Sequence, residues 1–189
     1  MSRDPIALSK FLSFVLRHKP EAIGLVLGDN GWVEIADLVT KATAGGEVFT
    51  AEDVLTCAAN NDKKRFTISD DGLRVRAAQG HSVEVDLALT PTTPPDILFH
   101  GTATRFVDAI RAEGLKPQSR QQVHLSRDEA TALKVGQRHG KPHIFQVEAG
   151  RMQADGYHFY VADNGVWLTD AVPSGYLIDF VSLQDTVHG

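Results

Sequence analysis

The clearest periodic pattern lies near the start of the chain, where apolar residues recur at helical spacing. They form one stripe consisting of Leu8, Phe11, Leu12, Val15 and Leu16. Repetition at i, i+3, i+4, i+7 and i+8 is typical of the buried face of a helix. Pro20 disfavours a helical residue before it, so we expect this helix to end near Arg17-His18-Lys19, where cations suit the helix dipole.

The rest of the first half predicts two more helices and a hairpin. After a turn at 28–31 and a short strand at 32–33, we expect a helix from Ile35 to Ala42. Thr50-Ala51-Glu52-Asp53 resembles a capping box that opens a helix to about Asn60. Residues 66–76 alternate apolar and polar side chains around a Ser-Asp-Asp-Gly turn, as a hairpin does. Three helices followed by a basic hairpin predict a winged-helix domain.

The second half has a different pattern. A proline-rich stretch without periodicity predicts a linker at 91–96, between domains at 1–90 and 97–189. Short apolar runs then alternate with helical stretches that start near Thr104 and Ser126, and Asn164-Gly165 is a hairpin signal. The runs are 97–99, 123–125, 144–147, 157–161, 166–168 and 176–181. The fold class predicted is α+β, with a mostly antiparallel sheet in the carboxy lobe.

Composition limits which classes of protein this sequence can belong to. The net charge of −5 gives no global basic field, so any contact with nucleic acid must depend on a local cation cluster. The single cysteine, Cys57, cannot form an internal disulfide, and no Cys/His set has zinc spacing. His139 and His143 are separated by helix-breaking Gly140 and Pro142, so we expect no metal site. With no signal region or long apolar run, we expect a cytoplasmic monomer that does not contact a membrane.

Few motifs are left to carry chemistry. Neither a Walker loop, nor a Gly-x-Gly-x-x-Gly after a strand, nor a Gly-x-Ser-x-Gly elbow occurs. Three features remain, each with a plainer interpretation. The Arg17-His18 pair also fits a helix cap, and Lys63-Lys64-Arg65 also fits a solvated strand entry. Phe99-His100-Gly101-Thr102 also fits an ordinary boundary, at which a strand ends and a helix begins with Thr102 as its cap.

The order of these features matches a known family. The chain resembles the NAD-dependent RNA (tRNA) 2′-phosphotransferases over nearly its whole length. The matching blocks are Ser9–Ser13 leading to Leu16–Pro20, Lys64–Phe66, Arg76–Ser82, Phe99–Thr102, Arg120–Ser126 and Asp163–Thr169. The resemblance implies a winged-helix RNA-binding lobe joined to an ADP-ribosyltransferase-like lobe that binds NAD, with the RNA phosphate site in the cleft between them.

The resemblance also implies an activity. The 2′-phosphate of an RNA, of the tRNA splice-junction kind, attacks the nicotinamide-bearing ribose carbon of the co-substrate NAD and expels nicotinamide. A ribose hydroxyl then attacks that phosphate, which gives 2′-hydroxyl RNA and ADP-ribose 1″,2″-cyclic phosphate. The acceptor in the first step is already an anion, so it needs no general base. This agrees with the lack of a clear counterpart to the carboxylate that related protein-modifying enzymes use.

The family's catalytic residues carry over to Arg17, His18, Arg65 and Arg120. Three guanidiniums can hold phosphate oxygens bidentately and spread the charge of phosphoryl transfer, and a histidine can move a proton near neutral pH. The sequence does not decide whether His18 acts as acid or base. By the same resemblance the NAD site is lined by His100, Gly101, Thr102, His124 and Ser126. Ser126 also fits a helix cap, with Glu129 completing a capping box.

Two other functions remain open at this stage. A nucleic-acid-binding regulator is disfavoured, because Glu52, Asp53 and apolar residues occupy the helix that would enter a duplex groove. The second alternative is an ADP-ribosyltransferase that modifies terminal phosphates of RNA or DNA and stops after the first step. Formation of the cyclic phosphate would distinguish the full reaction from that one.

Overall fold

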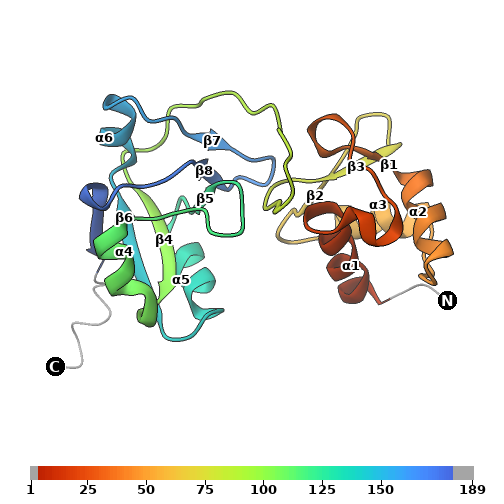
Figure 1. Cartoon of the computed structure of the whole chain (residues 1–189), viewed down its shortest axis with the longest axis horizontal. Helices are drawn as coiled ribbons and strands as arrows, with labels where there is room; N and C mark the ends of the chain where they lie inside the picture. The colour runs from red at the N-terminus through yellow and green to blue at the C-terminus, as the bar shows by residue number, and fades with distance from the viewer. Residues whose placement is uncertain (1–3, 181–189) are drawn as a thin grey trace. The chain divides into compact units, whose positions relative to one another are not determined.

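A computed structural model describes residues 4–180, which divide into two compact units (Figure 1). The first unit contains residues 4–89 and two short segments from later in the chain, Ser119–Gln121 and Ala162–Asn164. The second unit contains the remaining described residues from Thr90 onwards. Each unit has its own hydrophobic core. Helices and antiparallel sheets occur in both, so the predicted α+β class is confirmed.

Three helices of the first unit begin and end close to their predicted limits. Helix α1 (Pro5–Arg17) has Asp4 as its N-cap and His18 as its C-cap, so the end predicted from Pro20 is confirmed. Helix α2 covers Ile35–Ala44. Helix α3 (Ala51–Ala59) opens with the predicted capping box, in which the Thr50 side chain accepts from the Asp53 amide and the Asp53 carboxylate accepts from the Thr50 amide.

A small antiparallel sheet completes the first unit. Its strands are β1 (Val33–Glu34), β2 (Phe66–Ile68) and β3 (Arg74–Ala77), in the order β1-β3-β2. The predicted hairpin is therefore confirmed as β2 and β3. Short 3-10 turns at Pro20–Ile23 and Asp29–Gly31 join α1 to β1. The winged-helix assignment stays a prediction.

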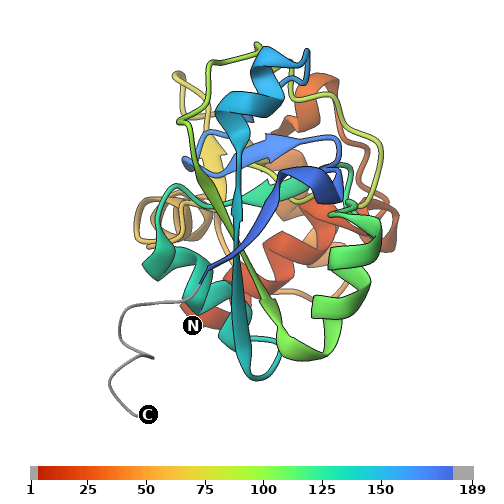
Figure 2. The same ribbon diagram turned by 90° about the vertical axis from the view of Figure 1, so that its left-hand side faces the viewer.

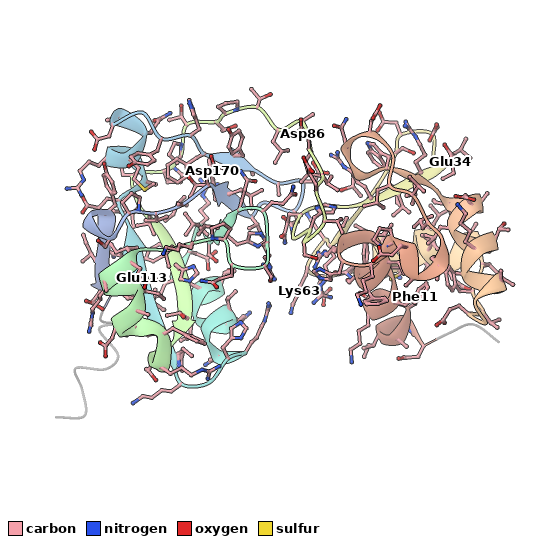
Figure 3. The ribbon with its side chains drawn as sticks, in the orientation of Figure 1. Phe11, Glu34, Lys63, Asp86, Glu113 and Asp170 are labelled. Atoms are coloured by element: carbon pink, nitrogen blue, oxygen red, sulfur yellow. The ribbon has the colours of Figure 1, made fainter. Side chains whose placement is uncertain are left out.

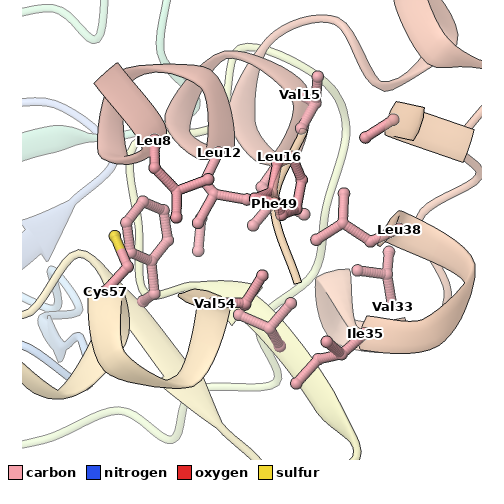
Figure 4. Packing of buried hydrophobic residues seen from close by; sticks show 14 of the residues in the cluster. Leu8, Leu12, Val15, Leu16, Val33, Ile35, Leu38, Phe49, Val54 and Cys57 are labelled. Atoms are coloured by element: carbon pink, nitrogen blue, oxygen red, sulfur yellow. The ribbon is translucent and has the colours of Figure 1, made fainter. Parts of the chain in front are cut away.

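The apolar stripe of α1 is the centre of the first core. Leu8, Leu12, Val15 and Leu16 are each no more than 2% exposed and point into the space between the three helices (Figure 4). Burial of such a side chain contributes about 1.5–3 kcal/mol. The predicted site residues Arg17 and His18 lie at the carboxy end of this helix, outside the buried stripe.

The second unit contains two antiparallel sheets. One consists of β4 (Leu98–Ala103), β6 (Pro142–Val147) and β9 (Leu177–Phe180), in that order (Figure 2). The other consists of β5 (Val123–Leu125), β8 (Trp167–Thr169) and β7 (Tyr160–Val161). The antiparallel pairing predicted from the alternating runs is confirmed, including the hairpin at Asn164-Gly165. Val181, the end of the last predicted strand, lies outside the described residues.

The helices of this unit differ more from prediction. They are α4 (Val107–Glu113), which follows a 3-10 turn at Thr104–Phe106, α5 (Glu129–Gln137) and α6 (Ala149–Ala154). The sequence did not predict α6 or the 3-10 turn at Ser174–Tyr176. No helix among residues 4–180 combines the length and apolar character that crossing a membrane would require.

The prediction that Ser126 caps a helix is wrong. Asp128 is the N-cap of α5, and its carboxylate accepts from the Thr131 amide at 2.7 Å. Ser126 is held two residues earlier, because its backbone exchanges two 2.8 Å hydrogen bonds with Phe99 of β4. The serine therefore forms an isolated bridge to β4 just after β5 ends.

Candidate active site

Arg17 is the last residue of α1, and its side chain is largely enclosed. The Nε and Nη2 atoms are buried and have no hydrogen-bond partner among the described residues. Burial, followed by the nearby charges of Arg65 and Arg120, lowers the pKa of Arg17 to about 10. A desolvated guanidinium with unused donors, next to two further cations, is suited to holding an anion with several oxygens.

A tight turn positions Arg65 beside α1. The Lys64 amide donates to the Asn61 carbonyl at 2.8 Å, and Lys64 adopts a left-handed conformation with φ of 44°. The Arg65 carbonyl then accepts from the Ala78 amide at 2.9 Å, just before β2 begins. This fixes the backbone of Arg65 on both sides and holds its half-buried side chain next to Arg17.

These residues share an open cavity of about 760 Å³ within the first unit. One wall is the solvent-facing side of α1, with Arg17 and His18 at its end, and the other is the end of α3 with the loop that leads to Arg65. Cys57, which the sequence left without a role, also lines this cavity, although it is only 8% exposed. Burial raises the pKa of its thiol, so Cys57 is a poor nucleophile.

Arg120 belongs to the segment Ser119–Gln121, which groups with the first unit. The sequence placed this residue in the carboxy lobe, and the structure corrects that placement. Its positive charge helps to lower the pKa of both Arg17 and His18. The four predicted catalytic residues therefore lie in one unit, although 103 positions separate Arg17 from Arg120 in the numbering.

His18, the C-cap of α1, is held by a residue that the sequence did not single out. Its Nδ1 lies 2.9 Å from the Oγ of Ser82. The Ser82 amide also donates to the Arg17 carbonyl at 2.9 Å. Burial, with the charges of Arg17 and Arg120, lowers the pKa of His18, so the imidazole is mainly neutral near pH 7. A neutral histidine can accept a proton at that pH.

The two residues before Ser82 shape the same corner. Gly80 has φ of +88°, and a Cβ on it would lie 3.6 Å from the Arg17 guanidinium. His81 is 2% exposed, and burial together with Arg17, His18 and Arg76 lowers its pKa to about 4. The only signal for these positions in the sequence was the block Arg76–Ser82, which matched the family as a unit without distinguishing its members.

The predicted cofactor residues lie on β4, on β5 and, for Ser126, just after β5, so they belong to two different sheets of the second unit. His100 on β4 and His124 on β5 meet where the Nδ1 of His100 lies 3.3 Å from the His124 carbonyl. Burial lowers the pKa of His100; the hydrogen bond to the His124 carbonyl opposes this, and the charge of His139 lowers the pKa further. A carbonyl only accepts, so Nδ1 of the neutral ring carries the proton and Nε2 is an acceptor.

Gly101 and Thr102 have a structural role that the sequence did not predict. A Cβ on Gly101 would lie 1.7 Å from the Ala132 carbonyl oxygen, so the absence of a side chain lets α5 pack closely on β4. Gly136 of α5 has the same role toward the Thr102 carbonyl. His100, Gly101 and Thr102 all lie inside β4, so the prediction of a strand end and a helix cap at Thr102 is wrong.

Residues 4–180 contain no group of three His, Cys, Asp or Glu side chains arranged to hold a metal ion. The two sites are built differently: the first consists of clustered cations, and the second has the neutral His100 beside the backbone of His124. Together they define an α+β protein in which one unit carries a cluster of cations suited to a phosphate-like anion.

Comparison with known proteins identifies the family. A model of the RNA 2′-phosphotransferase, Tpt1/KptA family matches residues 3–171, and the chain belongs to this family. A relative from Agrobacterium fabrum named "Probable RNA 2′-phosphotransferase" is 63% identical over 171 residues, which cover 90% of this chain and 92% of the relative. A relative of the same name from Acaryochloris marina is 53% identical over 179 residues, covering 95% of this chain and 99% of that protein.

Proposed function

We propose that this protein removes an internal 2′-phosphate from RNA by transferring it to the ADP-ribose part of NAD, which acts as a substrate. The observation that carries the proposal is the clustering of Arg17, Arg65 and Arg120 with His18. Burial first, and then repulsion from the like charges of Arg65 and Arg120, disfavours the charged form of Arg17 and lowers its pKa to about 10. A phosphate dianion removes this repulsion and provides acceptors for the unused donors of Arg17.

The first step uses the RNA phosphate as nucleophile. A phosphate oxygen forms a bond to the C1″ carbon of the nicotinamide ribose, and the bond from that carbon to nicotinamide breaks. The nucleophile is already an anion, so this chain has only to position it and balance its charge. The three arginines fit that task, because a guanidinium stays charged and presents its donors in a planar fork.

The second step needs a proton to move. The 2″-hydroxyl of the ADP-ribose attacks phosphorus, the bond from phosphorus to the RNA 2′-oxygen breaks, and that oxygen takes up a proton. The products are 2′-hydroxyl RNA and ADP-ribose 1″,2″-cyclic phosphate. His18 is mainly neutral near pH 7, so it is suited to accept the proton of the attacking hydroxyl and return it to the leaving oxygen.

The part of the second unit suited to NAD is where β4 meets the end of β5, two strands of different sheets that are joined by the bridge between Phe99 and Ser126. The Nε2 atom of His100 can accept from a ribose hydroxyl or a carboxamide, and His124 and Ser126 lie on the adjoining strand and its extension. Thr102 is 7% exposed and Gly101 is buried, so their contribution would be through the backbone and through the packing of α5. NAD supplies the ribosyl carbon and the nicotinamide leaving group.

One assay tests the proposal. The protein is incubated with NAD and an oligonucleotide that carries an internal 2′-phosphate, and three products are followed: nicotinamide, dephosphorylated RNA and ADP-ribose 1″,2″-cyclic phosphate. We expect all three in equal amounts. Stable ADP-ribose on a terminal phosphate, with no cyclic product, would favour a transferase that stops after the first step. Phosphate release without NAD would contradict the proposal.

A further inference from the structure

The cavity extends well beyond the four catalytic residues. It follows α1 from His18 back to Pro5 and Ile6, at the other end of the helix. At a rise of about 1.5 Å per residue, Lys10 lies about 10 Å along the axis from Arg17. A single phosphate held at Arg17 does not reach that far. The remote part of the cavity is therefore available to a neighbouring part of the substrate.

Two kinds of side chain distinguish this remote part. Phe14 lines the cavity one helical turn before Arg17 and is 43% exposed, and Ile6 further along is 66% exposed. Lys10 also lines the cavity from α1, and Lys63 lines it from the loop that leads to Arg65. The Lys63 side chain is labelled in Figure 3. Over the whole cavity, Lys10, Arg17, Lys63 and Arg65 outnumber the lining carboxylates of Asp53 and Asp62, and Asp53 is engaged in the capping box of α3.

The wall opposite α1 is held in place by one amide. Asn61 donates from Nδ2 to the Oγ of Ser9 at 3.1 Å, which ties the loop to α1. Its Oδ1 accepts from the Lys63 amide, also at 3.1 Å, which fixes the backbone of the lysine. The width of the cavity near Phe14 is therefore set before any ligand binds, and a preorganised site costs less to fill.

We propose that this face of α1 is a track for the single-stranded RNA that flanks the 2′-phosphate, with one base stacked on Phe14 and a neighbouring phosphate between Lys10 and Lys63. The proposal rests on the proposed function and adds to it a preference for substrate length. Exposed aromatic rings beside cations are the usual elements of single-strand binding, because every base has a face that can stack. A paired base would not be available for this contact.

The first test compares substrates of different length. A 2′-phosphorylated dinucleotide is measured against longer strands that extend it on the 5′ or the 3′ side. We expect one extension to lower KM, and Phe14→Ala to reduce that advantage at least about fivefold. Phe14→Trp should keep the advantage, and pairing the extension with a complementary strand should remove it. Leu73→Ala is the control, since Leu73 is 61% exposed in the same unit and does not line the cavity.

The second test does not depend on turnover. Fluorescently labelled single-stranded RNA without a 2′-phosphate is titrated with the unaltered protein, Phe14→Ala and Leu73→Ala. Weaker binding by Phe14→Ala alone supports the track even if no phosphate is removed, and in that case only the proposed function fails. Lys10→Gln should reduce the slope of log affinity against log salt by about 0.7. Equal RNA affinity of all three proteins, or a KM that is independent of substrate length, overturns the track.

Discussion

The two candidate sites differ in charge: the first gathers positive side chains, and the second contains a neutral histidine. In the first unit, Arg17 is enclosed beside Arg65 and Arg120, and its pKa falls to about 10. In the second unit, His100 is half-buried and neutral, and the strand that carries it is packed against α5 through Gly101. In the first arrangement, buried and repelling cations favour the binding of an anion, whereas the second carries no charge for a ligand to balance. Substitutions should therefore affect binding and chemistry in the first unit, and stability in the second.

The largest expected effect is at Arg65. Arg65→Lys keeps the positive charge but replaces a planar fork by a point charge, so we expect about a thousandfold loss of phosphate removal. Circular dichroism and thermal unfolding should be unchanged. Arg74→Lys is the control, because Arg74 is exposed on β3 and does not line the cavity. If the lysine variant at 65 keeps full turnover, charge alone is sufficient and the bidentate contact is wrong.

Regular elements were easier to predict than these sites. The stripe on α1 and the capping box at Thr50 depend on neighbours in sequence, and both were confirmed. The start of α5 was missed, because Ser126 and Asp128 are both good capping residues and only the pairing of Ser126 with Phe99 decides between them. Long-range contacts of this kind leave no periodic signal.

The same limit applies to the site residues. The resemblance named His18 and Arg120, but the contact of His18 with Ser82 and the grouping of Arg120 with the first unit depend on tertiary structure. Gly101 was expected to contact NAD, and a glycine in a matching block gives no indication that a helix carbonyl lies where its Cβ would be. The sequence therefore named positions, but it did not indicate which tertiary contacts each of them makes.

In the second unit, stability should depend on the volume of a substituted side chain rather than on its charge. Gly101→Ala places a methyl group 1.7 Å from the Ala132 carbonyl oxygen, so α5 must move away from β4. We expect a loss of about 3 kcal/mol in the free energy of unfolding, measured by chemical denaturation. Gly175→Ala is the matched control in the same unit, since its Cβ would meet nothing within 4 Å. Equal stability of the two variants would show that the packing of α5 on β4 is loose.

His81 should make the stability of the folded protein depend on pH. Its pKa is about 4 in the folded state and 6.5 ordinarily, so the unfolded chain binds more protons between these values. Stability should therefore fall as the pH drops from about 6.5 to 4, by about 3 kcal/mol from this residue. His81→Leu should flatten that part of the pH dependence. An unchanged slope in the leucine variant would mean that His81 is not held neutral in the folded protein.

His18 should separate the two chemical steps. Bond breaking to nicotinamide depends mainly on positioning and charge, whereas attack by a neutral ribose hydroxyl requires proton transfer. We expect His18→Ala to slow the second step about a hundredfold, so that ADP-ribosylated RNA accumulates and is visible on a gel. Arg65→Lys provides the contrast, because it should slow the first step as well. Equal slowing of both steps by His18→Ala, with no intermediate at any time, would place His18 in binding or in the first step.

The smallest expected effect is at Ser82, which acts through His18. Ser82→Ala removes the 2.9 Å contact to Nδ1 and should reduce kcat about fivefold with little change in KM, since a hydrogen bond contributes about 1 kcal/mol. The pH–rate profile adds a readout that a purely structural role would not move. If Nδ1–H donates to the serine, its loss lowers the pKa of His18, and if the serine donates to Nδ1, its loss raises that pKa. The direction of the shift therefore identifies the tautomer.

Ser82→Thr keeps a hydroxyl and should restore both kcat and the profile. A profile that does not move in Ser82→Ala, together with lost activity that threonine fails to restore, would show that the serine only closes the loop onto the end of α1.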